Sequence, residues 1–338
     1  MSTRQASQLM KRDENEEIEI GQQTSATFHQ ADVFLSLDSA AVATFDSEVE
    51  RFVDLLFGDP FRTPTGAEHA MFLAFAGSLR SADLSRQVGA VVVSQAGEVI
   101  ATGANDVPRY GGGLYWPGSD DQRDHIRGND SNKVEIEKIV QDILQKAQDR
   151  PTPPSRSELE KALRASRLRD LTEFGRAVHA EMEALLCCAR SGVNPRGGVL
   201  YCTTFPCHNC AKHIIAAGIE KVFYVEPYPK SLAAELHGDA IAVVQMIENR
   251  VCFLPFTGIA ARRYFDLFSL QVSSGRPMRR KDRSGVRKAP WDRKTAIPRV
   301  PMTAESYIER EMVANLTIRD TIRKGKANET RKKQRIRR

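Results

Sequence analysis

Two stretches decide the fold of this chain: H-A-E at residues 179–181 and T-T-F-P-C-H-N-C-A-K at residues 203–212. The first lies in a segment, 175–192, whose apolar spacing predicts a helix ended by a glycine. The second begins at the end of a short apolar strand, 199–203, and opens another helix at Cys207. Strand and helix alternate here, which predicts a layered α/β domain with helices packed on a sheet.

The same stretches carry the residue types of a catalytic zinc site. Zinc binds imidazole and thiolate ligands tetrahedrally, and a catalytic site uses three protein ligands and leaves the fourth position to water. His179, Cys207 and Cys210 supply three such ligands, and the two helix N-termini favour the thiolate forms. Glu181 is better placed to carry protons than to bind metal, because it can take a proton from the water and pass it to a substrate.

Other arrangements of these residues are less favoured by the pattern. A structural zinc site needs a closed fourth position and has no use for Glu181. His208 and His213 are near enough in sequence to be fourth ligands, although the backbone of His208, not its side chain, is expected to face the metal. The remaining cysteines, which no spacing pairs, are expected to be small buried hydrophobes: Cys187, Cys188, Cys202 and Cys252.

Apolar periodicity predicts further elements outside these stretches. Two helices are expected before the first strand, and Thr65 can cap the second of them. A helical insertion is expected between the first hairpin and the H-A-E segment, with a proline-rich break between its two helices. The expected helices cover 47–57, 68–81, 132–150 and 157–168, and the other expected strands cover 88–93, 98–102, 221–225 and 251–254.

Composition and charge restrict the class of protein. Hydrophobic residues make up 41% of the 338 residues and charged residues 27%, as in ordinary globular proteins. Six cysteines are too few for a disulfide framework at this length. No apolar run approaches the roughly 20 residues that span a bilayer, so we expect a cytoplasmic protein without a membrane partner.

The C-terminal residues are strongly basic. Residues 276–338 hold 21 Lys or Arg and 7 Asp or Glu, a charge of +14 within a whole-chain charge of +6, so residues 1–275 carry −8. Such a tail is either solvated and mobile or a contact for polyphosphate such as RNA. Trp291 within it can stack on a base or pin the tail to the protein body.

The chain resembles the cytidine deaminase-like superfamily, in which H-x-E and P-C-x-x-C form the zinc-deaminase signature. Within it, the chain is similar to the deoxycytidylate deaminases and, in detail, to the bacterial anti-phage dCTP/dCMP deaminases. The resemblance covers about 68–268. Besides the two deciding stretches, it rests on S-R-Q-V-G-A at 85–90, G-A-N at 103–105 and A-A-G-I-E-K-V at 216–222.

The resemblance implies a three-layer fold with a central mixed sheet and helices on both faces. It implies hydrolytic deamination of a free deoxycytidine nucleotide, dCTP or dCMP, in anti-phage defence by nucleotide depletion, and a homo-oligomer. Asn105 would hold the sugar or base, and the backbone at Ala180 would contact the pyrimidine carbonyl. Arg80 and Arg86 are candidate phosphate partners, because guanidinium binds phosphate through paired hydrogen bonds. Asn105 as a turn residue and the arginines as solvated surface groups remain alternatives.

The resemblance divides the chain into three regions. Residues 1–60 resemble the end of a P-loop kinase-like domain, although no G-x-x-x-x-G-K-[ST] phosphate loop occurs in the chain. Residues 61–273 form the deaminase domain, with an insertion at 109–172, and residues 274–338 form the basic C-terminal extension. The sequence departs from the usual pattern at the insertion and at Glu183, which replaces an Asn often found after H-A-E.

Two other functions stay open. The first is deamination of a base within tRNA or single-stranded DNA, which the basic tail would allow. The second is a non-catalytic RNA-binding regulatory module, against which the retention of all three ligands and Glu181 argues. Members of the anti-phage group are held inactive by a small RNA, which makes the tail a candidate contact for an inhibitory RNA.

Overall fold

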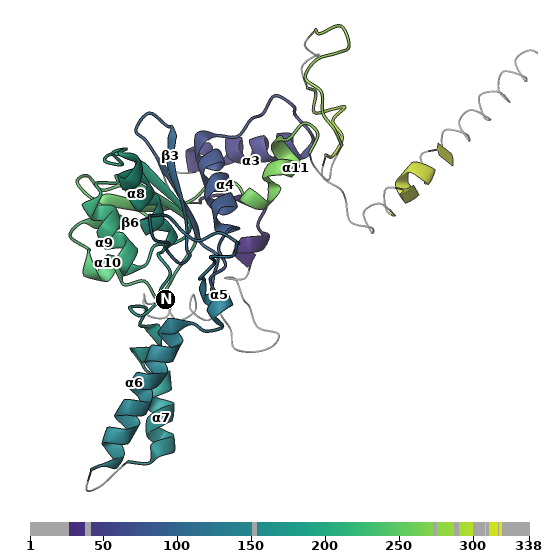
Figure 1. Ribbon diagram of the computed structural model, residues 1–338. Helices are drawn as coiled ribbons and strands as arrows, with labels where there is room; N and C mark the ends of the chain where they lie inside the picture. Colours follow the sequence, from purple (N-terminus) through teal and green to yellow (C-terminus); the bar gives the residue numbers. More distant parts are fainter. Residues whose placement is uncertain are drawn as a thin grey trace, which may run out of the picture. The chain divides into compact units, whose positions relative to one another are not determined.

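The chain divides into two compact units. The first comprises residues up to 48 together with 64–264, and the second comprises 49–63 together with residues from 265 onward. Figure 1 shows the elements along the chain. The computed structural model describes residues 27–37, 42–150, 154–272, 276–286, 291–299, 308, 311–316 and 318–319.

A six-stranded mixed sheet forms the centre of the first unit, with strand order β3-β2-β4-β5-β7-β6. Strand β2 pairs antiparallel with β3 and β4, whereas β4, β5, β7 and β6 are parallel to one another. The strands span Gly89–Val93 (β2), Val99–Ala104 (β3), Val199–Thr204 (β4), Lys221–Glu226 (β5), Ile241–Val243 (β6) and Val251–Pro255 (β7). The helices packed on them span Gly66–Ser78 (α4), Ala180–Ser191 (α8) and His208–Ala216 (α9).

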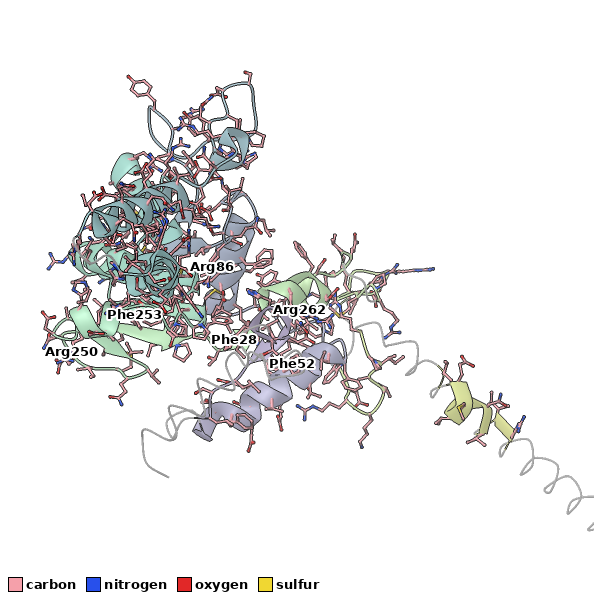
Figure 2. The ribbon with its side chains drawn as sticks, turned by 90° about the horizontal axis from the view of Figure 1, so that it is seen from below. Phe28, Phe52, Arg86, Arg250, Phe253 and Arg262 are labelled. Atoms are coloured by element: carbon pink, nitrogen blue, oxygen red, sulfur yellow. The ribbon has the colours of Figure 1, made fainter. Side chains whose placement is uncertain are left out.

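Helices cover both faces of this sheet, as strand β2 illustrates. All five of its residues are buried, and successive side chains point to opposite faces. Ala90 and Val92 pack in the cluster that contains residues of α8 and α9, whereas Val91 and Val93 pack with α4. Phe253 of β7 is fully buried in the first of these clusters (Figure 2). The expected three-layer α/β fold is therefore confirmed.

Helix α4 is fixed at its start and along its length. The Thr65 hydroxyl accepts from the Glu68 backbone N–H at 3.1 Å, and the Glu68 carboxylate accepts from the Thr65 N–H at 2.7 Å. This reciprocal cap confirms the expected role of Thr65. A Cβ atom at Gly89 would lie 1.8 Å from the Ala74 carbonyl oxygen, so only glycine lets α4 lie this close to β2.

The insertion forms a helical hairpin that extends from the first unit (Figure 1). Its two long helices pack on each other. Three buried residues of the longer helix, Val140, Leu144 and Ala147, follow the expected apolar spacing. The helices of the insertion span Asp124–Arg127 (α5), Ser131–Gln148 (α6), Arg156–Ala165 (α7) and, as a 3₁₀ turn, Arg167–Asp170 (η2).

The start of α8 differs from its sequence-based prediction. A helix was expected from residue 175, but α8 begins at Ala180. The reason is a short antiparallel bridge: Asp106 N–H donates to the Val178 carbonyl at 3.2 Å, and Val178 N–H donates to the Asp106 carbonyl at 2.9 Å. The bridge holds the residues before His179 in an extended conformation, and His179 becomes the residue that precedes the helix.

Several short elements gave no usable signal in the sequence. Strand β1 (Val33–Phe34) pairs antiparallel with β8 (Gly258–Ile259). Strand β6 was not predicted, and α3 starts at residue 42 rather than 47. The remaining elements span Val42–Leu56 (α3), Ala233–Leu236 (α10), Tyr264–Phe268 (α11), Phe28–Gln30 (η1) and Ala261–Arg263 (η3).

The second unit pairs part of the basic tail with acidic residues of α3. Asp54 is buried, and its carboxylate accepts from Arg62 at 3.0 Å and from Arg293 at 2.9 Å. The indole N–H of Trp291 donates to the Phe57 carbonyl at 3.1 Å, which is the pinning role that was one of its two alternatives. These contacts engage Trp291 and Arg293 within the protein itself.

Other sequence-based predictions fall on residues outside the described ones. These are residues 1–26 of the segment 1–60 that resembles the end of a P-loop domain, and residues 320–338 at the end of the basic extension. The division into regions 1–60, 61–273 and 274–338 stays a prediction. Among the described helices, none combines the length and the apolar character needed to cross a membrane.

Candidate active site

Three side chains from two helix starts meet at one point. The Nδ1 atom of His179 lies 3.4 Å from the Sγ of Cys207 and 3.3 Å from the Sγ of Cys210. The donor atoms of all three lie within 4.8 Å of one another. Tetrahedral zinc with Zn–S of about 2.3 Å and Zn–N of about 2.1 Å places sulfur and nitrogen about 3.6 Å apart. The donor types and spacings therefore fit zinc.

Helix starts position these donors. Cys207 precedes α9, and its sulfur accepts the Cys210 backbone N–H at 3.4 Å. His179 precedes α8 in an extended conformation. The first turn of α8 lies against β3 at Gly103, where a Cβ atom would be 2.1 Å from the Ala180 carbonyl oxygen. Glycine at this position is what allows the His179 end of α8 to approach the sheet.

Without metal, the three donors share protons as a charged cluster. The pKa of Cys207 falls to about 4, chiefly because the Cys210 thiol donates to its thiolate, with His179 as the next favourable contact. The pKa of His179 rises to about 9, chiefly through its hydrogen bond to Cys207. The pKa of the Cys210 thiol rises above its usual value because its proton is held by Cys207. Metal binding must displace the protons of His179 and Cys210.

Glu181 lies beside this cluster in a protected position. Its side chain is 4% exposed, and burial raises the pKa of its carboxyl group above the usual range. A carboxyl group with a raised pKa can hold and release a proton near neutral pH, which suits a general acid and base. The expected separation of roles, with three donors and one neighbouring acid, is compatible with this geometry.

The other candidate ligands do not join the cluster. Among the described residues, the metal-ligating groups that converge are His179, Cys207 and Cys210, so the imidazole of His208 is not a fourth donor. His213 is exposed on α9. The four remaining cysteines are unpaired thiols; Cys188, Cys202 and Cys252 are buried as expected, and Cys187 is partly buried.

A cavity of about 300 Å³ opens above the cluster. His179, Ala180, Glu181 and Cys207 line it together with Asn105. The Asn105 carboxamide accepts from the Val88 N–H at 2.7 Å and donates to the Arg86 carbonyl at 2.8 Å. Asn105 therefore also shapes the loop that leads into β2, in keeping with the turn role that the sequence left open.

The structure separates the two candidate phosphate partners. Arg86, labelled in Figure 2, lines the cavity. Its guanidinium lies 5.3 Å from the centre of the Tyr228 ring. Arg80 is not among the lining residues. Its guanidinium stacks on the Trp116 ring at 3.8 Å and donates to the Tyr115 carbonyl at 2.9 Å, so this cation is used to hold the start of the insertion.

Sequence reasoning missed several residues of the cavity. Tyr228 and Lys230 line it just after the C-terminal end of parallel strand β5. Ligands commonly bind at that end of parallel strands, so an aromatic and a cationic residue there could have been noticed. The insertion contributes further lining residues, and its polar loops carried no signal that would have placed them at the site.

Comparison with known proteins agrees with this geometry. Residues 65–226 match the family model described as the cytidine and deoxycytidylate deaminase zinc-binding region. The chain is 43% identical over 74 residues to ComE operon protein 2 of Bacillus subtilis. The aligned residues are 22% of this chain and 39% of that protein. It is 27% identical over 158 residues to the deoxycytidylate deaminase of Homo sapiens, 47% of this chain and 63% of that protein.

Among solved structures, the dCMP deaminase from the cyanophage S-TIM5 matches with a TM-score of 0.33 and 20% identity, over 58% of this chain and all of that one. The chain spans less than two thirds of the length of each of the two curated relatives. The match of residues 65–226 includes all three donors and Glu181, and it bears out zinc as the expected cofactor.

Proposed function

We propose that this chain, which belongs to the cytidine and deoxycytidylate deaminase superfamily, hydrolytically deaminates a free deoxycytidine nucleotide, with dCMP as the first substrate to test. The observation that carries the proposal is the convergence of His179, Cys207 and Cys210 beside a cavity of about 300 Å³, which His179, Cys207 and Glu181 line. This arrangement supports hydrolysis at an amino-substituted ring carbon rather than a structural metal role.

Each residue has a distinct task in this proposal. His179, Cys207 and Cys210 would hold zinc, which lowers the pKa of a bound water and so makes hydroxide available near neutral pH. Glu181 would take one proton of the water and deliver it to the ring nitrogen next to the amino-bearing carbon, while the hydroxide oxygen bonds to that carbon. It would then take the remaining hydroxyl proton and pass it to the amine, so that the C–N bond breaks, ammonia leaves and the carbonyl group of the product forms. Burial of Glu181 raises the pKa of its carboxyl group, which favours the protonated form that such transfers need.

The substrate orientation that the resemblance implies is compatible with the cavity lining. The base would lie over the metal cluster with its carbonyl group near the backbone at Ala180, and the sugar would lie near Asn105. The phosphate would then reach Arg86, and Lys230 is a second candidate partner in the same lining. Arg80 is left out of this assignment because its guanidinium is engaged by Trp116 and Tyr115.

The finer parts of the function rest on the resemblance alone. They are the use of dCTP in addition to dCMP, assembly into a homo-oligomer, and a role in anti-phage defence through nucleotide depletion. An inhibitory RNA at the basic tail gains no support from the described part of the chain, since Trp291 and Arg293 are engaged by residues of α3 or the turn that follows it.

The test is a chromatographic assay of zinc-loaded protein with dCMP, dCTP, cytidine and a cytosine-containing single strand. The Glu181→Gln variant keeps the side-chain shape and cannot carry the proton, so we expect at least a hundredfold loss of kcat, in line with the general effect of acid-base catalysis of about 10²–10⁴-fold. Glu135→Gln is the matched control, because the Glu135 side chain on α6 is 41% exposed and lies outside the cavity lining. Equal turnover by wild type and Glu181→Gln would contradict the proposed role.

A further inference from the structure

The insertion supplies one wall of the cavity. Six stretches of the chain line the cavity, and two of them, 124–132 and 172–181, lie within the insertion and at its end. These two segments are far apart in sequence, yet both reach the same pocket. The residues they contribute include Asp124, Asp130 and Asn132 from the beginning and Thr172, Gly175 and Arg176 from the end.

The two segments are joined firmly at their base. The backbone bridge between Asp106 and Val178 ties the end of β3 to the residues that precede His179. Arg123 is 5% exposed, and its guanidinium donates to Asp121 at 2.6 Å and lies 3.5 Å from Asp106. A buried charge that loses its partner is strongly destabilising, so this group of ions holds the beginning of the insertion in one place.

Further bonds join the segments at the level of the cavity. The Arg176 guanidinium donates to the Asp124 carboxylate at 2.5 Å. The Asn132 carboxamide donates to the Leu171 carbonyl at 2.7 Å and accepts the Phe174 N–H at 3.3 Å. These side chains connect the two segments directly, so the wall is already formed before a substrate enters.

We propose that this wall selects a free nucleotide and excludes a nucleotide that is part of a strand. The inference rests on the proposed deaminase function and names the element that limits its substrate. A nucleotide within a strand carries phosphodiesters at both its 5′ and 3′ oxygens, so a pocket that acts on it must be open where the strand enters and where it leaves. The wall closes one side of the pocket, because side-chain hydrogen bonds and an ion pair hold its two segments together.

The charge of the wall acts in the same direction. Asp124 neutralises Arg176, and the Asp130 carboxylate caps α6 and lies 3.9 Å from Lys133, so the lining residues on the insertion side of the pocket offer no unpaired cation to a second phosphate group. The cations Arg86 and Lys230 lie on other segments of the lining. One phosphate is therefore favoured at the cavity, and the additional phosphates of a strand are disfavoured on the insertion side.

The hairpin beyond the wall provides an internal control. Its helices α6 and α7 pack on each other, and exposed pairs such as Lys138 with Glu135 and Arg164 with Glu160 cover its surface. Residues 138–162 are not part of the cavity lining. Replacing them by a short Gly-Ser turn removes most of the hairpin and leaves the wall residues in the chain.

The experiment measures how strongly a single-stranded oligodeoxynucleotide with one cytosine inhibits turnover of dCMP by the full chain. A thymine-only strand of equal length corrects for general binding to basic residues. In the variant Asp124→Ala/Asn132→Ala, which breaks the same bonds and removes a carboxylate from the wall, we expect the inhibition constant of the cytosine strand, relative to that of the thymine strand, to fall at least about tenfold, while the hairpin-shortened variant keeps the wild-type ratio.

Two outcomes would overturn the inference: an unchanged ratio in the wall variant, or the same fall in the hairpin-shortened variant. Zinc content and thermal unfolding show whether the wall variant is folded, and the single variant Asn132→Ala replaces it if it is not. Absence of dCMP turnover by the wild type would instead contradict the proposed function. Failure of the wall to select is thereby distinguished from failure of the activity.

Discussion

Replacement of Gly103 by alanine should separate the role of α8 packing from the role of the metal donors themselves. A Cβ atom at this position would lie 2.1 Å from the Ala180 carbonyl oxygen and 2.5 Å from the Ala184 nitrogen. Both are backbone atoms of α8, so no side chain can rotate away. To restore an ordinary contact, the first turn of α8 must move by about 1 Å, since close-packed interiors have little free space.

This displacement would act directly on the metal donors. His179 is the residue before α8, and its Nδ1 atom lies 3.3 to 3.4 Å from the two sulfurs. Metal–ligand distances tolerate deviations of about 0.2 Å, so a shift of about 1 Å removes the imidazole from an ideal position. We expect zinc affinity to fall at least about tenfold and the protein to lose about 1–3 kcal/mol of stability through overpacking.

Chelator competition measures the zinc affinity, and urea unfolding measures the free energy of unfolding. Gly66→Ala is the matched control, because Gly66 lies in the first turn of α4, has no atom within 4 Å of the added Cβ, and adopts no left-handed conformation. It should bind zinc as the wild type does. Wild-type zinc affinity together with full turnover in Gly103→Ala would refute the reasoning that Gly103 sets the position of His179.

Two further measurements test the site and the fold. Zinc affinity should rise with pH, because binding displaces one proton from His179, whose pKa is raised to about 9, and one from Cys210, whose pKa is also raised, whereas Cys207 is already a thiolate above about pH 4. Between pH 5.5 and 8 the logarithm of the zinc association constant should increase by about two per pH unit, measured with a competing chelator whose own pH dependence is known; a slope near zero would contradict the protonated donor cluster. Thr65→Ala removes the reciprocal cap of α4 and should lower the free energy of unfolding in urea by about 1 kcal/mol, with dCMP turnover by the zinc-loaded variant unchanged; an equal stability would mean that water replaces the cap.

The parts of the site that the sequence predicted are those that depend on local spacing. Cys207 and Cys210 are one helical turn apart and His179 directly precedes a helix, so the sequence places each donor at a helix start without knowledge of the tertiary fold. The buried run of β2 was equally clear, because a strand covered on both faces is apolar at every position.

The parts that were missed depend on contacts between distant residues. Strands β1 and β8 have two residues each, too short for any periodicity, and they exist because they pair with each other. The start of α8 was placed too early because the bridge between Asp106 and Val178, which keeps the chain extended, joins residues 72 positions apart. The sequence made Arg80 a candidate phosphate partner, but the ring of Trp116, 36 residues later, stacks on its guanidinium.

Glu183 shows how a local departure from the family pattern can follow from such distant contacts. It stands where related sequences often have Asn, and its carboxylate is 6% exposed, so it needs a cation. Arg190 supplies one: its guanidinium donates to the Glu183 carboxylate at 2.5 Å from two turns further along α8. The stem of Arg190 also lies against Gly112, where a Cβ atom would be 2.8 Å from the Arg190 Cδ. The Glu183 carboxylate therefore fixes an arginine whose stem lies against Gly112, in the first part of the insertion.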